Sequence, residues 1–253
     1  MSAASSATTG AIGSTTTPRL YLLDVEGTVA PISLVSEQLF PYARAHFPEF
    51  LQNHANDLNV FADLSLLAAE NRNESESGCP TFGAASSRLR WEDAVPYLGW
   101  LMDHDRKSTA LKSLQGKIWK SGFESGELKG TLFTDVPDAL RRWSATAQVA
   151  IYSSGSIEAQ RLVFRHSIFG DLTNLIAAYF DTRTGPKQAS ASYAAIAAAM
   201  KVAPESMLFL SDVVRELDAA REAGCETRLV MRQGNPPVED AHGHAAVESF
   251  AFL

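Results

Sequence analysis

One short acidic stretch near the N-terminus constrains the fold of this chain most strongly. The apolar run Leu20–Leu23 stops at two carboxylates, Asp24 and Glu26, and a Gly27-Thr28 turn follows directly. An apolar run bounded by a glycine turn is typical of a buried strand that delivers polar groups at its carboxyl end. Two carboxylates placed there repel each other unless a cation lies between them. The stretch therefore predicts a Mg²⁺ site with one carboxylate free to attack, with an ordinary strand and acidic turn as the simpler alternative.

The composition is that of a globular protein. The chain has 253 residues, of which 45% are hydrophobic and 20% charged, enough for one large domain or two smaller ones. The net charge is −7 and no basic cluster stands out, so we expect neither nucleic-acid nor membrane-surface binding. No apolar run approaches the roughly 20 residues that a membrane-spanning helix needs.

The cysteines and the first residues bear on the environment of the protein. Cys79 and Cys225 are isolated, so they predict neither a CxxC metal pair nor a disulfide framework, and they fit a reducing compartment. We expect a cytoplasmic monomer, with the nucleus as a second location in a eukaryotic cell. Residues 1–17 are almost entirely Ser, Thr, Ala and Gly, which favours a disordered tail over a signal or transit peptide.

Two kinds of pattern follow the first strand. From Pro31 to about Gly130, apolar residues recur at helical spacings of three and four, and Pro41 and Pro48 are expected to break the first run into pieces. Beyond Gly130, short apolar runs alternate with helical patterns. The expected strands are Val149–Tyr152, Leu175–Phe180, Met207–Leu210 and, as the last one, Thr227–Met231.

Alternating strands and helices indicate an α/β fold with a parallel sheet. Because a helical block separates the first strand from the others, we predict a Rossmann-like core with a helical cap inserted after that strand. The predicted division is residues 1–17 as the tail, 18–30 and 131–253 as the core, and 31–130 as the cap.

Polar side chains follow the predicted strands where these end. Ser153 and Ser154 follow the second strand of the core, Asp212 follows a later one, and Lys187 follows a Gly-Pro turn. Each has a simpler explanation, since serine and aspartate often cap helices and a lone lysine is usually exposed. In a parallel sheet, however, all these ends share one edge with Asp24. Serines at a helix N-terminus, a lysine and two acids for Mg²⁺ together fit a phosphomonoester substrate.

Four segments carry a resemblance to a known family. Asp24–Thr28, Ser153-Ser154, Lys187 and Asp212 resemble the four motifs of the haloacid dehalogenase superfamily. Within it, Glu26 in place of the usual aspartate resembles the enolase-phosphatase, or acireductone synthase, family of methionine salvage. Further segments share that likeness, namely Leu39–Tyr42, Leu114–Gly116, Ile151–Ser156 and Phe209–Glu216.

The resemblance implies a bifunctional Mg²⁺-dependent enzyme. It would enolise 2,3-diketo-5-methylthiopentyl 1-phosphate and then remove the phosphate, giving the acireductone 1,2-dihydroxy-3-keto-5-methylthiopentene. Asp24 would be the nucleophile, Glu26 a candidate acid or base, and Ser153, Ser154 and Lys187 the phosphate ligands. Asp24, Asp212 and Glu26, the last through its backbone carbonyl, would hold Mg²⁺. The alternatives are another Mg²⁺-dependent small-metabolite phosphatase or phosphomutase of the superfamily, and a non-catalytic regulatory module.

The predicted cap would exclude water and select the methylthio tail. Its aromatic and thioether side chains are candidates for lining that pocket, namely Trp91, Tyr97, Met102 and Phe123. The base of the enolisation is not identified, and Asp103, His104 and Lys107 are titratable residues of the cap. His242 and His244 are expected at the surface, whereas Cys225 is expected to be buried.

Overall fold

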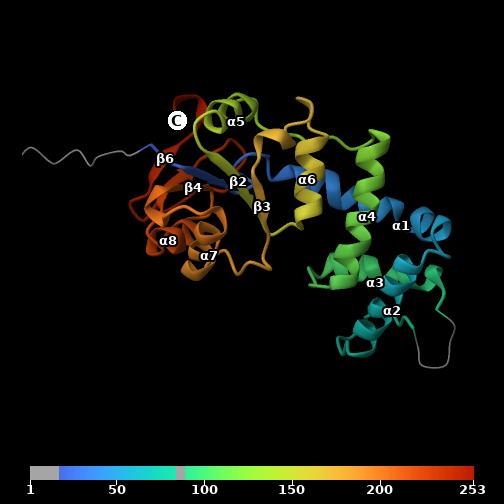
Figure 1. Ribbon diagram of the computed structural model, residues 1–253. Coiled ribbons are helices and arrows are strands. Elements are labelled where there is room, and N and C mark those ends of the chain that lie inside the picture. The colour runs from blue at the N-terminus through green and yellow to red at the C-terminus, as the bar shows by residue number, and fades with distance from the viewer. Residues whose placement is uncertain (1–16, 84–88) are drawn as a thin grey trace, which may run out of the picture.

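A parallel sheet of six strands forms the centre of the protein, in the order β3-β2-β1-β4-β5-β6. The computed structural model describes residues 17–83 and 89–253 (Figure 1). The strands are β1 (Leu20–Leu23), β2 (Gln148–Tyr152), β3 (Ala178–Phe180), β4 (Met207–Ser211), β5 (Glu226–Val230) and β6 (Ala245–Val247). The predicted α/β fold class is thus confirmed, and the order reverses next to β1, where such sheets bind ligands.

Strand β1 is central and buried on both faces. It pairs with β2 on one side and with β4 on the other, so that Leu23 is level with Ile151 and Leu210. Tyr21 and Leu23 belong to the apolar cluster on one face of the sheet, and their neighbours Leu20 and Leu22 belong to the cluster on the other. Burial on both faces is why the run is apolar throughout instead of alternating.

Helices cover both faces of the sheet. α5 (Val136–Ser144) and α6 (Ile157–Arg165) pack on one face, and α7 (Ser190–Met200) and α8 (Val214–Glu222) on the other (Figure 1). Three short 3-10 turns accompany them, η2 (Thr173–Leu175), η3 (Pro204–Ser206) and η4 (Phe250–Phe252). Each long helix follows a strand or the helical block, which gives the three layers of a doubly wound fold.

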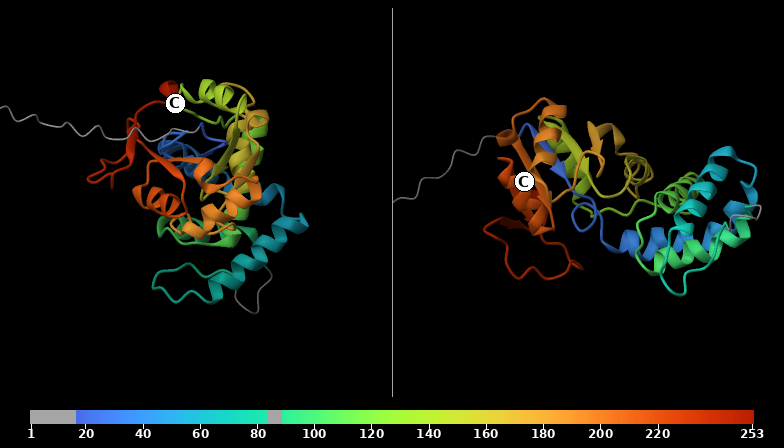
Figure 2. Two further views of the ribbon diagram at one scale, coloured as in Figure 1. Left: turned by 60° about the vertical axis from the view of Figure 1, so that its left-hand side comes forward. Right: turned by 90° about the horizontal axis from the view of Figure 1, so that it is seen from below.

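A block of helices lies between β1 and β2 in the chain and to one side of the sheet (Figure 2). It comprises the π-helix η1 (Leu34–Leu39), α1 (Phe40–Asn53), α2 (Leu58–Arg72), α3 (Trp91–Asp103) and α4 (Thr109–Ser125). Most of its buried apolar residues form a cluster of their own, drawn from residues 43–118. Leu34, Leu39 and Phe123 belong instead to the cluster on one face of the sheet. None of the helices within residues 17–83 and 89–253 is both long and apolar enough to span a membrane.

Several expected elements differ in the structure. Pro41 was expected to break the first run, but it lies in the first turn of α1, which follows the π-helix η1 directly. Pro48 lies inside α1, which continues because Ala43, Phe47 and Leu51 are buried along one face. Part of the expected strand Leu175–Phe180 is a 3-10 turn, and only Ala178–Phe180 pairs in the sheet.

Two corrections concern the C-terminal region. Thr227–Met231 was expected to contain the last strand, yet β6 adds an edge strand beside β5. His244 was expected at the surface and is instead 6% exposed, because its ring lies between the Thr227 hydroxyl, 2.7 Å from Nδ1, and Asp218, 3.1 Å from Nε2. His242 is exposed and Cys225 is buried, as expected. The expected tail lies outside the described residues apart from Thr17.

Arg232 joins the C-terminal segment to the two chain segments that connect the sheet with the helical block. Its Nε donates to the Thr28 carbonyl at 3.1 Å, and Nη1 donates to Asp135 at 2.9 Å. The guanidinium lies over the rings of Phe133 and Phe250, at 4.5 and 4.3 Å from their centroids. Burial alone would raise the pKa of Asp135, but hydrogen bonds from Arg232 and from the Phe250 N–H outweigh it and hold that pKa below its usual value.

We predict that Asp135→Asn lowers the free energy of unfolding at pH 7 by about 1.5–3 kcal/mol, since it removes the charged partner of a buried arginine. Asp135 has its lower pKa in the folded state, so its contribution is present above the ordinary value of 3.8 and is lost as the pH falls below it. Urea unfolding of both proteins between pH 7 and pH 3 should show the difference shrinking below about pH 4. The exposed Asp105→Asn should stay within about 0.5 kcal/mol of the wild type, and an equal loss there would refute the assignment.

Candidate active site

Lys187 is buried between two carboxylates at the carboxyl edge of the sheet. Its Nζ lies 2.6 Å from Asp24 Oδ1 and 2.6 Å from Glu216 Oε2. The Ser211 hydroxyl, at the end of β4, lies 3.3 Å from Asp24 Oδ2 and 3.1 Å from Glu216 Oε2 and can donate its proton to either. The Val25 N–H also donates to Asp24 Oδ1, at 2.7 Å. The lysine is therefore an internal counter-ion of the predicted nucleophile and not a solvated turn residue.

The protonation states of Lys187, Asp24 and Glu216 depend on one another. Burial disfavours the ammonium of Lys187, but the carboxylates of Asp24 and Glu216 outweigh burial and raise its pKa. Burial and the nearby Asp24 raise the pKa of Glu216, and Lys187 opposes that rise. A charged lysine thus holds two acids together in a region that water cannot screen well.

Asp212 lies against the turn that follows Asp24. Asn235 Nδ2 donates to the Gly27 carbonyl at 2.8 Å and lies 3.3 Å from Asp212 Oδ2. Gly27 has φ +71, and a Cβ added to it would lie 2.2 Å from Asp212 Oδ2. Burial and the charge of Asp24 raise the pKa of Asp212 to about 7. Only glycine leaves room for this carboxylate, and the turn places it close enough to Asp24 for the two acids to repel.

The donor set fits Mg²⁺. Among the described residues no group of three or more His, Cys, Asp or Glu side chains is gathered as a metal cluster. Mg²⁺ needs less, because it usually takes one or two carboxylates and keeps several waters. Asp24 and Asp212 offer two such carboxylates, and the raised pKa of Asp212 reflects negative charge that a divalent cation would relieve. The backbone carbonyl of Glu26 is the further oxygen that the motif predicts.

The three serines of the turn after β2 have different surroundings. Ser153 is buried, and its Oγ accepts from the Gly155 N–H at 3.2 Å. Ser156 caps α6 by accepting from the Ala159 N–H at 3.2 Å, which is the simpler role considered for this turn. Ser154 is exposed and lines a cleft beside the sheet edge. The turn combines a helix N-terminus with a free hydroxyl, an arrangement that suits an anion.

That cleft lies between the sheet edge and the helical block and has a volume of about 560 Å³. Glu26 lines it, and burial and the nearby Asp24 raise the pKa of its carboxyl group. The opposite wall is largely apolar, with Val35, Phe40, Leu101, Met102, Leu111 and Trp119 among its residues. Of the predicted site residues, Glu26 and Ser154 line this cavity. The others, Asp24, Ser153, Lys187 and Asp212, are not part of its lining.

Only some of the residues suggested for the cap line the cleft. Met102, Asp103 and Lys107 line the cleft. Tyr97 and Phe123 are buried in apolar clusters, Trp91 packs against one of them, and His104 stacks on Trp100 with ring centroids 4.3 Å apart. None of these four side chains is part of the cleft lining, so Met102 alone of the suggested pocket residues is placed as expected.

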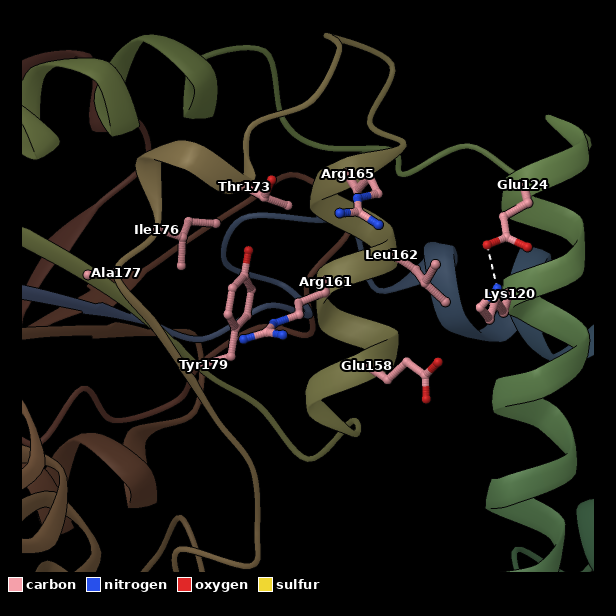
Figure 3. A pocket seen from close by; sticks show the side chains of 10 residues that line it. All are labelled: Lys120, Glu124, Glu158, Arg161, Leu162, Arg165, Thr173, Ile176, Ala177 and Tyr179. Atoms are coloured by element: carbon pink, nitrogen blue, oxygen red, sulfur yellow. Dashed lines mark hydrogen bonds and ion pairs between the residues drawn. The ribbon is translucent and has the colours of Figure 1, made fainter. Parts of the chain in front are cut away.

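A second hollow of about 360 Å³ lies between α4 and α6 (Figure 3). Charged side chains of the two helices line it, with Arg161 over the ring of Tyr179 at 5.4 Å. None of the residues that follow the strands is among its lining. The cleft beside Glu26 is therefore the candidate site.

Sequence reasoning left out two residues of this site. Glu216 was noted only as part of a motif, although its place in the first turn of α8, shortly after Asp212, was a usable signal. Asn235 lies in an irregular C-terminal segment that has no periodic pattern. Its contact with Gly27 could not be found from spacing.

Comparisons with known proteins agree with this geometry. The family model for haloacid dehalogenase-like hydrolases matches residues 18–224. The protein named Enolase-phosphatase E1 from Synechococcus elongatus is 51% identical over 219 residues, which cover 86% of this chain and 90% of that protein. This chain belongs to the enolase-phosphatase family of haloacid dehalogenase-like hydrolases. A second enolase-phosphatase, from Pseudomonas aeruginosa, is 44% identical over 94% of this chain and 98% of its own length.

Solved structures show the same fold. The UTR4 protein of Saccharomyces cerevisiae superposes with a TM-score of 0.77 at 35% identity, covering 93% of this chain and 100% of that one. The magnesium-bound hydrolase YfnB of Bacillus subtilis, at 14% identity, superposes with a TM-score of 0.51 over 93% of this chain and 96% of its own. Enolase-phosphatases thus share their architecture with more distant hydrolases.

We predict that Gly27→Ala lowers phosphatase turnover of this enolase-phosphatase by about 100-fold or more, because the added methyl group displaces Asp212. Steady-state phosphate release at saturating Mg²⁺ measures the effect. Gly78→Ala is the matched control, since Gly78 has a similar φ of +85 with nothing within 4 Å of the added Cβ. Equal losses in both variants would mean that backbone strain, and not the displacement of Asp212, causes the effect.

Proposed function

We propose that the protein converts 2,3-diketo-5-methylthiopentyl 1-phosphate to the acireductone 1,2-dihydroxy-3-keto-5-methylthiopentene and phosphate. It does so as a cytoplasmic, Mg²⁺-dependent monomer that acts by enolisation and then phosphoryl transfer. The observation that carries the proposal is Asp24, held by Lys187 and beside Asp212, with Glu26 lining the adjoining cleft. Membership of the enolase-phosphatase family supports the choice of substrate over other phosphomonoesters.

Asp24 performs the phosphoryl transfer. Its carboxylate attacks phosphorus, the bond from phosphorus to the ester oxygen breaks, and the enol oxygen leaves with the electron pair and takes up a proton. Water then hydrolyses the aspartyl phosphate, which restores the carboxylate and releases phosphate. Ser153, Ser154 and Lys187 hold the phosphoryl oxygens by hydrogen bonds and charge. Bound Mg²⁺, held by Asp24, Asp212 and the Glu26 carbonyl, would neutralise the repulsion between the nucleophile and the phosphate.

Glu26 is the candidate acid or base of the enolisation. In that step the carbon bearing the phosphate ester loses a proton, the electron pair forms the carbon–carbon double bond, and the neighbouring carbonyl oxygen gains a proton. Burial and Asp24 raise the pKa of Glu26, which brings a carboxyl group nearer to the range useful for proton transfer. Its position in the cleft lining gives it access to a bound substrate.

We also propose that residues 18–30 and 131–253 form the catalytic core and that 31–130 form a cap over it. The separate apolar cluster within residues 43–118 supports this division. The cleft lies where the two parts meet, so a substrate held there would be sheltered from water on both sides.

The experiment that tests the function is Asp24→Asn. We expect a loss of phosphate release from the diketo phosphate on the order of 1,000-fold or more, because the amide cannot act as the nucleophile. With the wild type, stopped-flow absorbance should show an enol intermediate and then the acireductone. The control is Asp240→Asn, the same change at an exposed position, which should retain wild-type activity. Phosphate release without an enol would support a general phosphatase or phosphomutase. If no phosphomonoester is turned over by the wild type with Mg²⁺, the protein is a regulatory module and not an enzyme.

A second variant addresses Glu26. We expect Glu26→Gln to slow formation of the enol by about 100-fold or more, because it removes a proton-transfer group while keeping the shape and the backbone carbonyl. Single-turnover absorbance separates this step from phosphate release. Unchanged rates for both steps would show that the side chain has no part in proton transfer.

A further inference from the structure

Gln115 is a largely buried residue of the helical block whose amide is not hydrogen-bonded within the part of the chain that the structure describes. It lies in α4, is 4% exposed, and its side chain makes no hydrogen bond with any of the described residues. A glutamine amide without a protein partner is available to bond to water or to a ligand. The amide is not sealed off from solvent, and Gln115 lines the cleft that also contains Glu26 and Ser154, so the amide is open to the candidate site.

The surroundings of Gln115 are apolar. Leu111 and Trp119 lie one turn before and after it on the same face of α4, and both line the cleft. Trp119 uses its only polar atom elsewhere, since Nε1 donates to the Leu39 carbonyl at 2.8 Å. Phe40 stacks on Trp119 with ring centroids 6.3 Å apart and extends the same wall. Along α4 the amide of Gln115 thus lies between two apolar lining residues, Leu111 and Trp119.

The charged residues of the cleft are placed differently. Lys107 and Lys112 line it but are exposed, and Arg44 is exposed and paired with Asp103. A charged ligand group would therefore be met near solvent or at the acidic sheet edge. The buried recess at Gln115 suits an uncharged chain that carries an oxygen atom.

We propose that Gln115 is a specificity residue, which donates its Nε2–H to a carbonyl oxygen of the substrate chain while the apolar wall holds the thioether end. This proposal rests on the diketo phosphate being the substrate. An amide offers both a donor and an acceptor, so the same side chain can also accept from the hydroxyl of the enol product. It moves no proton itself, and its effect is to orient the diketone for the residues that do.

Two variants and two substrates test the proposal. Gln115→Met keeps an unbranched chain of similar length without hydrogen-bonding groups. Gln115→Glu keeps the shape and the acceptor oxygens but has no N–H donor when ionised. The substrates are the diketo phosphate and p-nitrophenyl phosphate, which shares the phosphate but has no carbonyl chain. Gln52→Leu, at an exposed position of α1, is the control for changing a helical glutamine.

We expect both Gln115 variants to lower kcat/KM for the diketo phosphate by about tenfold or more, with turnover of p-nitrophenyl phosphate within about twofold of the wild type. Gln115→Met should melt close to the wild-type temperature, because the change removes no hydrogen bond to a described residue. Gln52→Leu should leave both substrates unaffected.

Each contrary result has its own meaning. Unchanged turnover of the diketo phosphate by Gln115→Met, or an equal loss with both substrates, overturns the specificity role. Full activity of Gln115→Glu overturns the donor assignment, and a clearly lower melting temperature of Gln115→Met shows that the amide has an internal structural role. A wild type that hydrolyses p-nitrophenyl phosphate but not the diketo phosphate overturns the proposed function itself, and with it the ligand assigned to Gln115.

Discussion

The buried ammonium of Lys187 is the interaction on which the carboxyl edge of the sheet depends. It lies within hydrogen-bonding distance of both Asp24 and Glu216, and without it two acids would face each other in a region shielded from water. One positive charge does not balance this pair together with Asp212 and Glu26, whose pKa values rise on burial beside Asp24. The negative charge that remains suits the edge to a divalent cation and, once that is bound, to a phosphoryl group.

The position of β1 places the start of the helical block close to Asp24 in the chain. Asp24, the proposed nucleophile, follows the central strand directly, and the block begins shortly afterwards with η1 at Leu34. The Phe133 N–H donates to the Val29 carbonyl at 3.0 Å, so the outgoing and returning segments are joined to each other. Arg232, in the C-terminal segment, donates a hydrogen bond to the neighbouring Thr28 carbonyl. These hydrogen bonds tie the turn after Asp24 to the segment that returns from the helical block and to the C-terminal segment.

The elements that could be predicted from the sequence are those whose buried residues form a clear apolar pattern along the chain. Leu20–Leu23 is apolar because both faces of β1 are covered, and the parallel sheet places Asp24 and Asp212 at one edge. β6 escaped prediction because Ala245–Val247 is a short edge strand with little burial. Pro48 was wrongly expected to end a helix, since the packing of α1 outweighs one missing hydrogen bond. The burial of His244 comes from side chains of other elements, so its local Gly and Ala neighbours gave no sign of it.

The sequence by itself determined which chemical groups are present and their order along the chain: an acid pair, a serine turn, a lysine and a third acid. It could do so because strand burial and turn residues leave local patterns that parallel pairing converts into one edge. The tertiary structure decided which groups meet. Lys187 pairs with Asp24 across 163 positions, and Asn235 reaches Gly27 across 208. The position of Gln115 in the lining of the cleft is likewise a product of tertiary packing. Such contacts depend on how helices and loops pack, and local sequence patterns carry no record of that packing.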